Sequence, residues 1–285
     1  MSKVALVTDS TAYIPAELSK QATIETVPLQ VIWGDETQRD GVDIQPAQFY
    51  QRLQTTRTLP TTSQPSPAAF KGVYEKLLSQ GYQILSVHIS SKLSGTVDSA
   101  QQARNMLPNA PIEIIDSQLT SMGMGYPVLI AARAAEQGAT LQECKILAEQ
   151  ACHNSGIIFA VNTLEFLHRG GRIGGAAAFL GTALNLKPLL ELRGGRIEAV
   201  ERIRTMSKAT ERLLDLIEQR VGARTPIHLA AVHAAGPEMA EALLEKARAR
   251  FSLTAVNQTA IADVSPVIGV HTGPGCVGLT FTAGM

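Results

Sequence analysis

Short apolar runs, polar turns and helical periods follow one another along the first half of the chain. The run at 84–89 has the apolar character of a parallel strand that is covered on both faces. A hydroxyl-rich turn at 90–96 follows it, and a helix is expected from there to about residue 107. A turn of this kind is a common anion site in open α/β sheets. The same hydroxyls are also ordinary helix caps, so both interpretations stay open.

The same order of strand and polar turn occurs three times in this half. Because the carboxyl ends of parallel strands meet at one edge of a sheet, the pattern predicts a ligand crevice along that edge. The turns contain Asp9 and Ser10, Ser90 and Ser91, and Asp116 and Ser117.

The remaining elements of the first half are predicted from periodicity, caps and turn residues. Strands are expected at 3–7, 26–33 and 112–115, and helices at 15–20, 46–53, 67–79, 122–136 and from 141 onward. The last of these helices should begin with a capping box formed by Thr140 and Glu143. The segment 61–67 is expected to be a turn, with Ser66 as the cap of the helix that follows.

The pattern changes near residue 155, where the second half begins. The pair Gly194-Gly195 within 189–200 predicts a hairpin and therefore antiparallel pairing. Strands are also expected at 156–161, 227–232, 253–261 and 276–282, helices at 176–184, 207–221 and 237–251, and a loop around His271. We therefore predict an α/β protein of two domains. Residues 1–154 would form a mostly parallel sheet with flanking helices, and 155–285 an α/β domain with a mixed or antiparallel sheet.

Composition narrows the possible functions. The chain has 25 Lys plus Arg and 25 Asp plus Glu, which argues against a nucleic-acid-binding protein. Three scattered cysteines and the spacing of the His, Asp and Glu residues predict neither a disulfide framework nor a metal site. Neither glycine-rich nucleotide motif is present, so no bound dinucleotide or ATP is inferred. The lack of a long apolar run or a leader pattern predicts a soluble, cytoplasmic protein.

Two groups of residues carry candidate chemistry. Basic residues outnumber acidic ones between His168 and Lys208, and Arg169 and Arg172 lie there among glycines. This segment is either a solvated face or a site for phosphate or an acidic partner, and the phosphate interpretation would make the protein a phosphotransferase. Ser94 and His271, with Asp9 or Asp116, would be the residues of an acyl hydrolase or transferase, although no GxSxG motif is present.

Seven motifs together carry a family resemblance. They are VTDSTAYIP at 7–15, TTSQPSP at 61–67, ISSKLSGT at 89–96, DS at 116–117, LEFLHRGGRIGG at 164–175, LKPLL at 186–190 and VIGVHTGPG at 267–275. In this order they span nearly the whole chain, and they resemble the DegV family of bacterial fatty-acid-binding proteins.

The resemblance implies a carrier and not an enzyme. A long-chain fatty acid would lie between the two α/β domains. Its carboxylate would be presented to a separate ATP-dependent fatty acid kinase, which makes acyl-phosphate for phospholipid synthesis. The protein would work in the bacterial cytoplasm without a cofactor, as a monomer or a weak dimer. The acyl chain length is not predicted, because it depends on the shape of the tunnel.

The resemblance also assigns roles to residues. Thr62, Ser94 and His271 would bind the carboxylate, although the adjacent Thr61 leaves open which threonine faces the ligand. Arg172 would engage the kinase, and Arg169 is expected to dock beside it. The expected neighbours of the carboxylate are Ser63, Gly95, Thr96, Asp9 and Ser10. Whether Asp9, Ser10, Asp116 and Ser117 touch the ligand or only shape the crevice is left open. The apolar stretches 122–135 and 176–190 are candidates for tunnel walls or for ordinary core.

Overall fold

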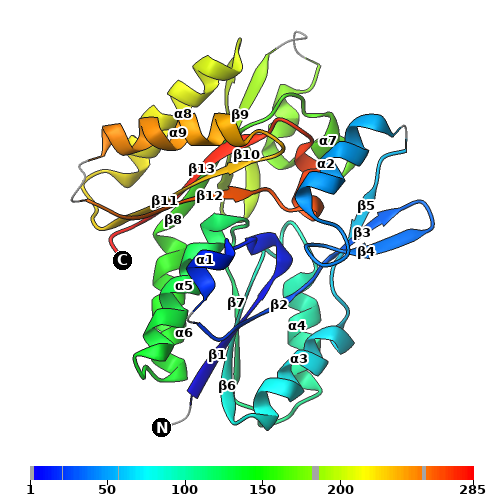
Figure 1. The fold of residues 1–285 in the computed structure, drawn as a ribbon, viewed down its shortest axis with the longest axis vertical. Coiled ribbons are helices and arrows are strands. Elements are labelled where there is room, and N and C mark those ends of the chain that lie inside the picture. Colours follow the sequence, from blue (N-terminus) through cyan, green and yellow to red (C-terminus); the bar gives the residue numbers. More distant parts are fainter. Residues whose placement is uncertain (1–2, 21, 57, 182–185, 252–254) are drawn as a thin grey trace.

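The computed structural model describes residues 3–20, 22–56, 58–181, 186–251 and 255–285. They form a mixed α/β fold with three sheets, whose strand orders are β2-β1-β6-β7, β10-β9-β8-β13-β11-β12 and β4-β3-β5 (Figure 1). The strands are β1 Lys3–Asp9, β2 Ile24–Val27, β3 Gln30–Trp33, β4 Glu36–Arg39, β5 Thr61–Ser63, β6 Tyr82–His88, β7 Ile112–Asp116, β8 Ser155–Ala160, β9 Lys187–Arg193, β10 Arg196–Ile203, β11 Ile227–His233, β12 Val256–Asp263 and β13 Val277–Ala283. The helices are η1 Ser10–Ala12, α1 Ala16–Ser19, α2 Pro46–Thr55, α3 Pro67–Ser79, α4 Thr96–Asn105, α5 Met122–Glu136, α6 Leu141–His153, α7 Glu165–Arg169, η2 Gly174–Phe179, α8 Met206–Val221, α9 Pro237–Arg250 and α10 Pro266–Thr272.

The four-stranded sheet is parallel throughout, as predicted. Alternate side chains of a strand point to opposite faces, and both faces of this sheet are covered. Leu6 of β1 packs with α5 and α6, whereas its neighbour Val7 packs with α3 and α4. This double cover explains why the central strands are apolar without a break.

The six-stranded sheet is mixed, which confirms the predicted fold class. Its strands pair in antiparallel fashion except for β11 with β12. Gly194 and Gly195 both take positive φ angles, 54° and 79°, in the tight turn that joins β9 to β10. Helices α8 and α9 lie side by side on one face of this sheet (Figure 1).

Helix α5 joins the two large sheets. Ten of its residues are buried, because it packs on β1 of one sheet and on β8 and β13 of the other. The Tyr126 hydroxyl donates to the carbonyl oxygen of Leu229 on β11 at 2.7 Å. The predicted domain boundary at residue 154 lies between α6 and β8, and this division of the chain stays a prediction.

The third sheet is small and was not predicted. We expected one strand at 26–33, but the chain turns at Pro28 and places β2 and β3 in different sheets. Proline has no amide hydrogen to donate to a ladder, which favours a break there. The expected turn at 61–67 is also wrong at its start, since Thr61–Ser63 pairs with β3 as strand β5.

Two further expectations were wrong in the second half. His271 lies in helix α10 and not in a loop, and the Ser265 side chain caps this helix by accepting from the Ile268 amide. The helix expected at 176–184 is a short 3-10 helix, Gly174–Phe179, and the part at 182–184 lies outside the described residues. The strand expected from 253 is described from Val256 onward, and 253–254 lie outside the described residues.

Helix α10 packs tightly against helix α2. The Tyr50 hydroxyl donates to the Val264 carbonyl oxygen at 2.9 Å. A Cβ at Gly269 would lie only 2.6 Å from the Tyr50 hydroxyl oxygen, so this approach requires glycine. Within the described part of the chain, no helix has the length and apolar character needed to cross a membrane.

Candidate functional site

A cavity lies where the three sheets meet, and it spans about 840 Å³ with its open mouth included. Its apolar wall consists of Leu29, Ile89, Leu93, Ile157, Phe159, Leu167, Leu192, Ile197, Val232, Val264, Val267, Ile268 and Cys276. Its polar residues are Thr62, Ser63, Gln64, Ser94, Thr120, Ser121, Arg172, His271 and Thr272. A mostly apolar cavity with a few polar groups fits an amphipathic small molecule.

Thr62 and His271 meet in this cavity. Oγ1 of Thr62 lies 3.0 Å from Nε2 of His271, although one residue is on β5 and the other on α10. Burial and the nearby Arg172 guanidinium lower the pKa of His271 to about 4, so its imidazole is neutral near pH 7. A Cβ at Gly170 would lie 2.1 Å from Nδ1 of His271, so the glycine-rich segment leaves room for the ring.

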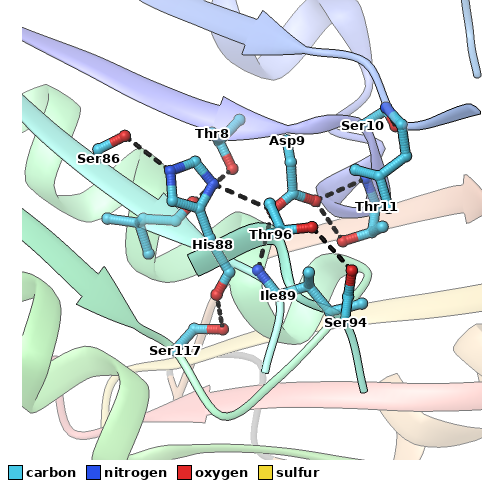
Figure 2. Close-up of polar contacts among 12 residues, drawn as sticks. Thr8, Asp9, Ser10, Thr11, Ser86, His88, Ile89, Ser94, Thr96 and Ser117 are labelled. Carbon is cyan, nitrogen blue, oxygen red and sulfur yellow. Dashed lines mark hydrogen bonds and ion pairs between the residues drawn. The ribbon is translucent and has the colours of Figure 1, made fainter. Parts of the chain in front are cut away.

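Ser94 lies in the turn between β6 and α4. Its Oγ lies 2.8 Å from Oγ1 of Thr96 (Figure 2). Its amide donates to the Ser90 carbonyl oxygen. Thr96 is fully buried and is not part of the cavity wall. Gly95 caps α4 and lies close to the Gln64 side chain, from which a Cβ would be 3.1 Å away.

Arg172 connects the two sides of the cavity. Its Nε donates to the Leu93 carbonyl oxygen at 3.1 Å and its Nη1 to the Gly170 carbonyl oxygen at 2.7 Å. Arg169 lies outside the cavity wall, is exposed, and forms an ion pair with Glu165 at 2.8 Å. Both arginines of the glycine-rich basic segment are therefore exposed, but only Arg172 also lines the cavity.

The structure places Asp9 in a buried network outside the cavity wall. Its Oδ1 accepts from the amide and the hydroxyl of Thr11 at 3.0 and 2.6 Å. Its Oδ2 accepts from the Ile89 amide at 2.9 Å and lies 3.1 Å from Nδ1 of His88 (Figure 2). The carboxylate thus joins the turn after β1 to the end of β6.

Ser10 also lies outside the cavity wall, with both hydrogen-bonding functions of its hydroxyl in use. It donates to Oδ2 of Asp40 at 2.7 Å and accepts from the Leu29 amide at 3.0 Å. Asp116 accepts from the Ser91 hydroxyl and amide, and the Ser117 hydroxyl donates to the His88 carbonyl oxygen at 2.6 Å. These polar turns hold the sheet edge together.

A hairpin from the six-stranded sheet fixes the turn that carries Ser94. The Ser90 hydroxyl donates to the Gly195 carbonyl oxygen at 2.8 Å, and Nζ of Lys92 donates to the Gly194 carbonyl oxygen at 2.7 Å. The turn therefore depends on residues about a hundred positions later in the chain.

Comparison with known proteins assigns the family. A family model described as "Uncharacterised protein, DegV family" matches residues 3–284. This chain belongs to the DegV family.

Relatives and solved structures agree with this assignment. A DegV domain-containing protein of Streptomyces coelicolor is 41% identical over 281 residues, which cover 98% of each chain. A Thermus thermophilus structure, described as fatty acid binding of a DegV family protein, is 38% identical with a TM-score of 0.92 and covers 99% of each chain. The Bacillus subtilis DegV structure, described as a fatty acid binding protein, is 33% identical with a TM-score of 0.89. It covers 99% of this chain and 100% of that one.

Asp40 is a buried residue of this DegV chain that sequence reasoning missed. Burial raises the pKa of Asp40 to about 7. The Ser10 hydroxyl and the Val267 amide both donate to the carboxylate, which lowers the pKa, but burial has the larger effect. Val267 belongs to the first turn of α10, so Asp40 links this helix to the turn after β1. An aspartate beside a glycine indicates an exposed turn from sequence alone, so no local signal marked it.

The residues of the alternative hydrolytic site are not joined to one another. Ser94 bonds to Thr96 and His271 to Thr62, whereas Asp9 and Asp116 are engaged with other groups. Among the described residues, no cluster of three or more His, Cys, Asp or Glu side chains could hold a metal ion.

Proposed function

We propose that this DegV chain binds a long-chain fatty acid in the cavity, with the carboxylate at Thr62, Ser94 and His271. The observation that carries the proposal is the 3.0 Å contact between Thr62 and His271 in a cavity whose wall is mostly apolar. The DegV structures from Thermus thermophilus and Bacillus subtilis are described as fatty-acid-binding proteins, which supports the ligand class.

The polar residues of the cavity suit a carboxylate. Removing this group from water costs several kcal/mol unless donors replace its hydration. The hydroxyls of Thr62 and Ser94 are donors of the right kind, with Ser63 beside them in the wall. His271 becomes a third donor when its Nε2 carries the proton. Gly95 and Thr96 act indirectly, since they form the start of α4 and hold Ser94.

The apolar wall would supply most of the affinity. Burial of an acyl chain contributes about 0.8 kcal/mol for each methylene group. Ile157 and Phe159 of β8 and Val232 of β11 form part of this wall, so the tail would lie against the inner face of the six-stranded sheet. No cofactor is required by this role.

We further propose that the protein is a carrier that presents the carboxylate to a separate ATP-dependent fatty acid kinase in the bacterial cytoplasm. The acyl-phosphate so formed would enter phospholipid synthesis. A neutral set of hydroxyls and an uncharged imidazole leave the carboxylate oxygen nucleophilic enough to accept a phosphoryl group. Arg169 is exposed and Arg172 reaches the cavity, which suits a docking surface next to the carboxylate.

Native mass spectrometry of the protein purified from bacteria tests the ligand. We expect an added mass equal to that of a long-chain fatty acid, and release of the acid on denaturation. Ser94→Ala should weaken binding of added fatty acid roughly ten- to a hundredfold, because one hydrogen bond to a charged group is lost. The control Ser79→Ala, at the end of α3 and outside the cavity wall, should leave it unchanged. A protein that is isolated empty and binds no added fatty acid would refute the proposal.

The carrier role has its own test. A bacterial fatty acid kinase with ATP should form acyl-phosphate only when this protein supplies the acid. Arg169→Ala should slow the reaction without changing the affinity for the fatty acid. Arg104→Ala, at the end of α4, should change neither the rate nor the affinity. Equal rates for all three proteins would exclude docking through this segment. Ester hydrolysis by the protein alone would favour the hydrolase alternative.

A further inference from the structure

Two polar side chains in the cavity wall have no hydrogen-bond partner. Thr120 and Ser121 lie in the connection between β7 and α5, and their side chains are 7% and 3% exposed. Neither hydroxyl oxygen makes a hydrogen bond to any of the described residues. An unpaired hydroxyl is costly inside a protein, so each such group requires a physical explanation.

Helix α5 begins directly after these two residues. No side chain caps the helix, and the Met124 amide donates to the Ser121 carbonyl oxygen at 2.9 Å. The helix dipole makes this end slightly positive, which favours an electron-rich oxygen. The backbone is nevertheless held in place, because the Ser121 amide donates to the Thr11 carbonyl oxygen at 2.9 Å.

We propose that Thr120 and Ser121 form a second polar subsite, which accepts an oxygen substituent on the acyl chain. The ligand class is then a hydroxy- or oxo-fatty acid, and the inference rests on the proposed binding of a fatty acid in this cavity. The carboxylate itself is held by Thr62, Ser94 and His271, which belong to other elements of the wall.

The chemistry of the subsite favours a neutral oxygen over a second anion. Hydroxyls both donate and accept, so they can pair with a hydroxyl or with a carbonyl group. The only cationic side chain among the described residues of the wall is Arg172, and it is bonded to the carbonyl oxygens of Leu93 and Gly170. The apolar residues of the wall, such as Ile157 and Phe159, cannot form a hydrogen bond with an oxygen substituent on the acyl chain.

Competition binding with matched acids tests the subsite. The probes are octadecanoic acid and a series of monohydroxy-octadecanoic acids that differ in the position of the hydroxyl. The measured quantity is the ratio of the dissociation constants of each hydroxy acid and the parent acid. We expect Thr120→Val to shift this ratio roughly three- to tenfold toward the parent acid for at least one isomer. The parent acid should bind the variant at least as tightly, since an unpaired hydroxyl has been removed.

Two further variants keep the test decisive. Ser121→Gly removes the second hydroxyl and suits the φ of 52° at this position, so it serves if Thr120→Val does not fold. Thr280→Val removes a buried hydroxyl that bonds to Ala230 outside the cavity wall, and it should leave every ratio unchanged. If the ratio of dissociation constants is the same in both cavity variants as in the wild type, the proposed subsite is refuted, and the two hydroxyls would instead bind a water molecule. Failure of the wild-type protein to bind octadecanoic acid would instead refute the proposed function.

Discussion

Oγ1 of Thr62 and Nε2 of His271 lie 3.0 Å apart, although 209 positions separate these residues in the chain. Thr62 is brought there by its pairing with Val31 in the three-stranded sheet. His271 is brought there by α10, which packs against α2 and is linked to Asp40 at its first turn. The polar end of the cavity is therefore a product of tertiary structure, and its chemistry should respond to changes in either support.

His271 should make stability depend on pH. Its pKa is about 4 in the folded protein and 6.5 in the unfolded chain, so the unfolded chain binds more protons between these values. The contribution of His271 to the free energy of unfolding, about 2 to 3 kcal/mol, is present above pH 6.5 and is lost as the pH falls toward 4. Urea denaturation of the ligand-free protein at several pH values measures it. His271→Gln should remove this contribution from the pH profile, whereas the exposed His153→Gln should leave the profile unchanged.

Asp40 should act in the opposite direction. Its pKa is raised from 3.8 to about 7, so the folded protein binds more protons across this window. The contribution of Asp40 to the free energy of unfolding should therefore fall as the pH rises from about 4 to 7. Asp40→Asn should remove this falling contribution, so the profile of the variant should rise with pH and the variant should be comparatively more stable at pH 8, whereas Asp35→Asn in an exposed turn should leave the profile unchanged. A wild-type curve that remains unchanged in Asp40→Asn would show that this carboxyl titrates normally.

The two titrations overlap, and this affects how they must be measured. His271 stabilises the fold with rising pH, whereas Asp40 destabilises it over much of the same range. The wild-type profile should therefore be flatter than that of either variant. The double variant should again be flat, and this distinguishes compensation from the absence of both effects.

Asp9 should be required for stability more than for ligand contact. Its carboxylate accepts from three donors of Thr11 and Ile89 and faces Nδ1 of His88. Asp9→Ala would leave these buried donors unpaired, and we expect a loss of about 3 to 5 kcal/mol in the free energy of unfolding. Asp98→Ala, at an exposed site in α4, should cost less than about 1 kcal/mol. If Asp9→Ala lowered the free energy of unfolding as little as Asp98→Ala, water would be accepting the hydrogen bonds that the carboxylate accepts in the wild type.

The hairpin glycines offer a matched pair for testing how the Ser94 turn is held. Both have positive φ, so alanine strains the backbone at either position. A Cβ at Gly194 would meet nothing within 4 Å, whereas one at Gly195 would lie 2.5 Å from the Ser90 hydroxyl oxygen. Gly195→Ala should therefore weaken fatty-acid binding severalfold, and Gly194→Ala should leave it nearly unchanged. Equal effects of the two substitutions would show that the hairpin does not position Ser94.

The sequence was most informative where local patterns decide the structure. Helix α5 begins at Met122 and ends at Glu136, as predicted from its apolar residues. The capping box of Thr140 and Glu143 and the hairpin at Gly194 were also predicted correctly, because their hydrogen bonds are short in sequence. The alternation of strands and helices was enough to predict a parallel sheet in the first half.

The errors occurred where distant partners decide the structure. Thr61–Ser63 became a strand only because β3 lies beside it, and a three-residue strand has no periodicity to detect. Helix α10 did have a local signal, since Ser265-Pro266 repeats the cap and first residue seen at Ser66-Pro67. In sequence, the polar turns at Asp9 and Asp116 resemble the turn at Ser94. Only the fold separates the turn that reaches the cavity from those that bind their neighbours.

The order of the site residues along the chain limits how such a protein can be divided. Thr62 and Ser94 precede β8, whereas Arg172 and His271 follow it. No single truncation can keep the polar end of the cavity whole, because each half of the chain supplies only part of it. Exchange of one half between relatives would therefore have to preserve every contact that crosses β8, such as those of Thr62 with His271 and of Leu93 with Arg172.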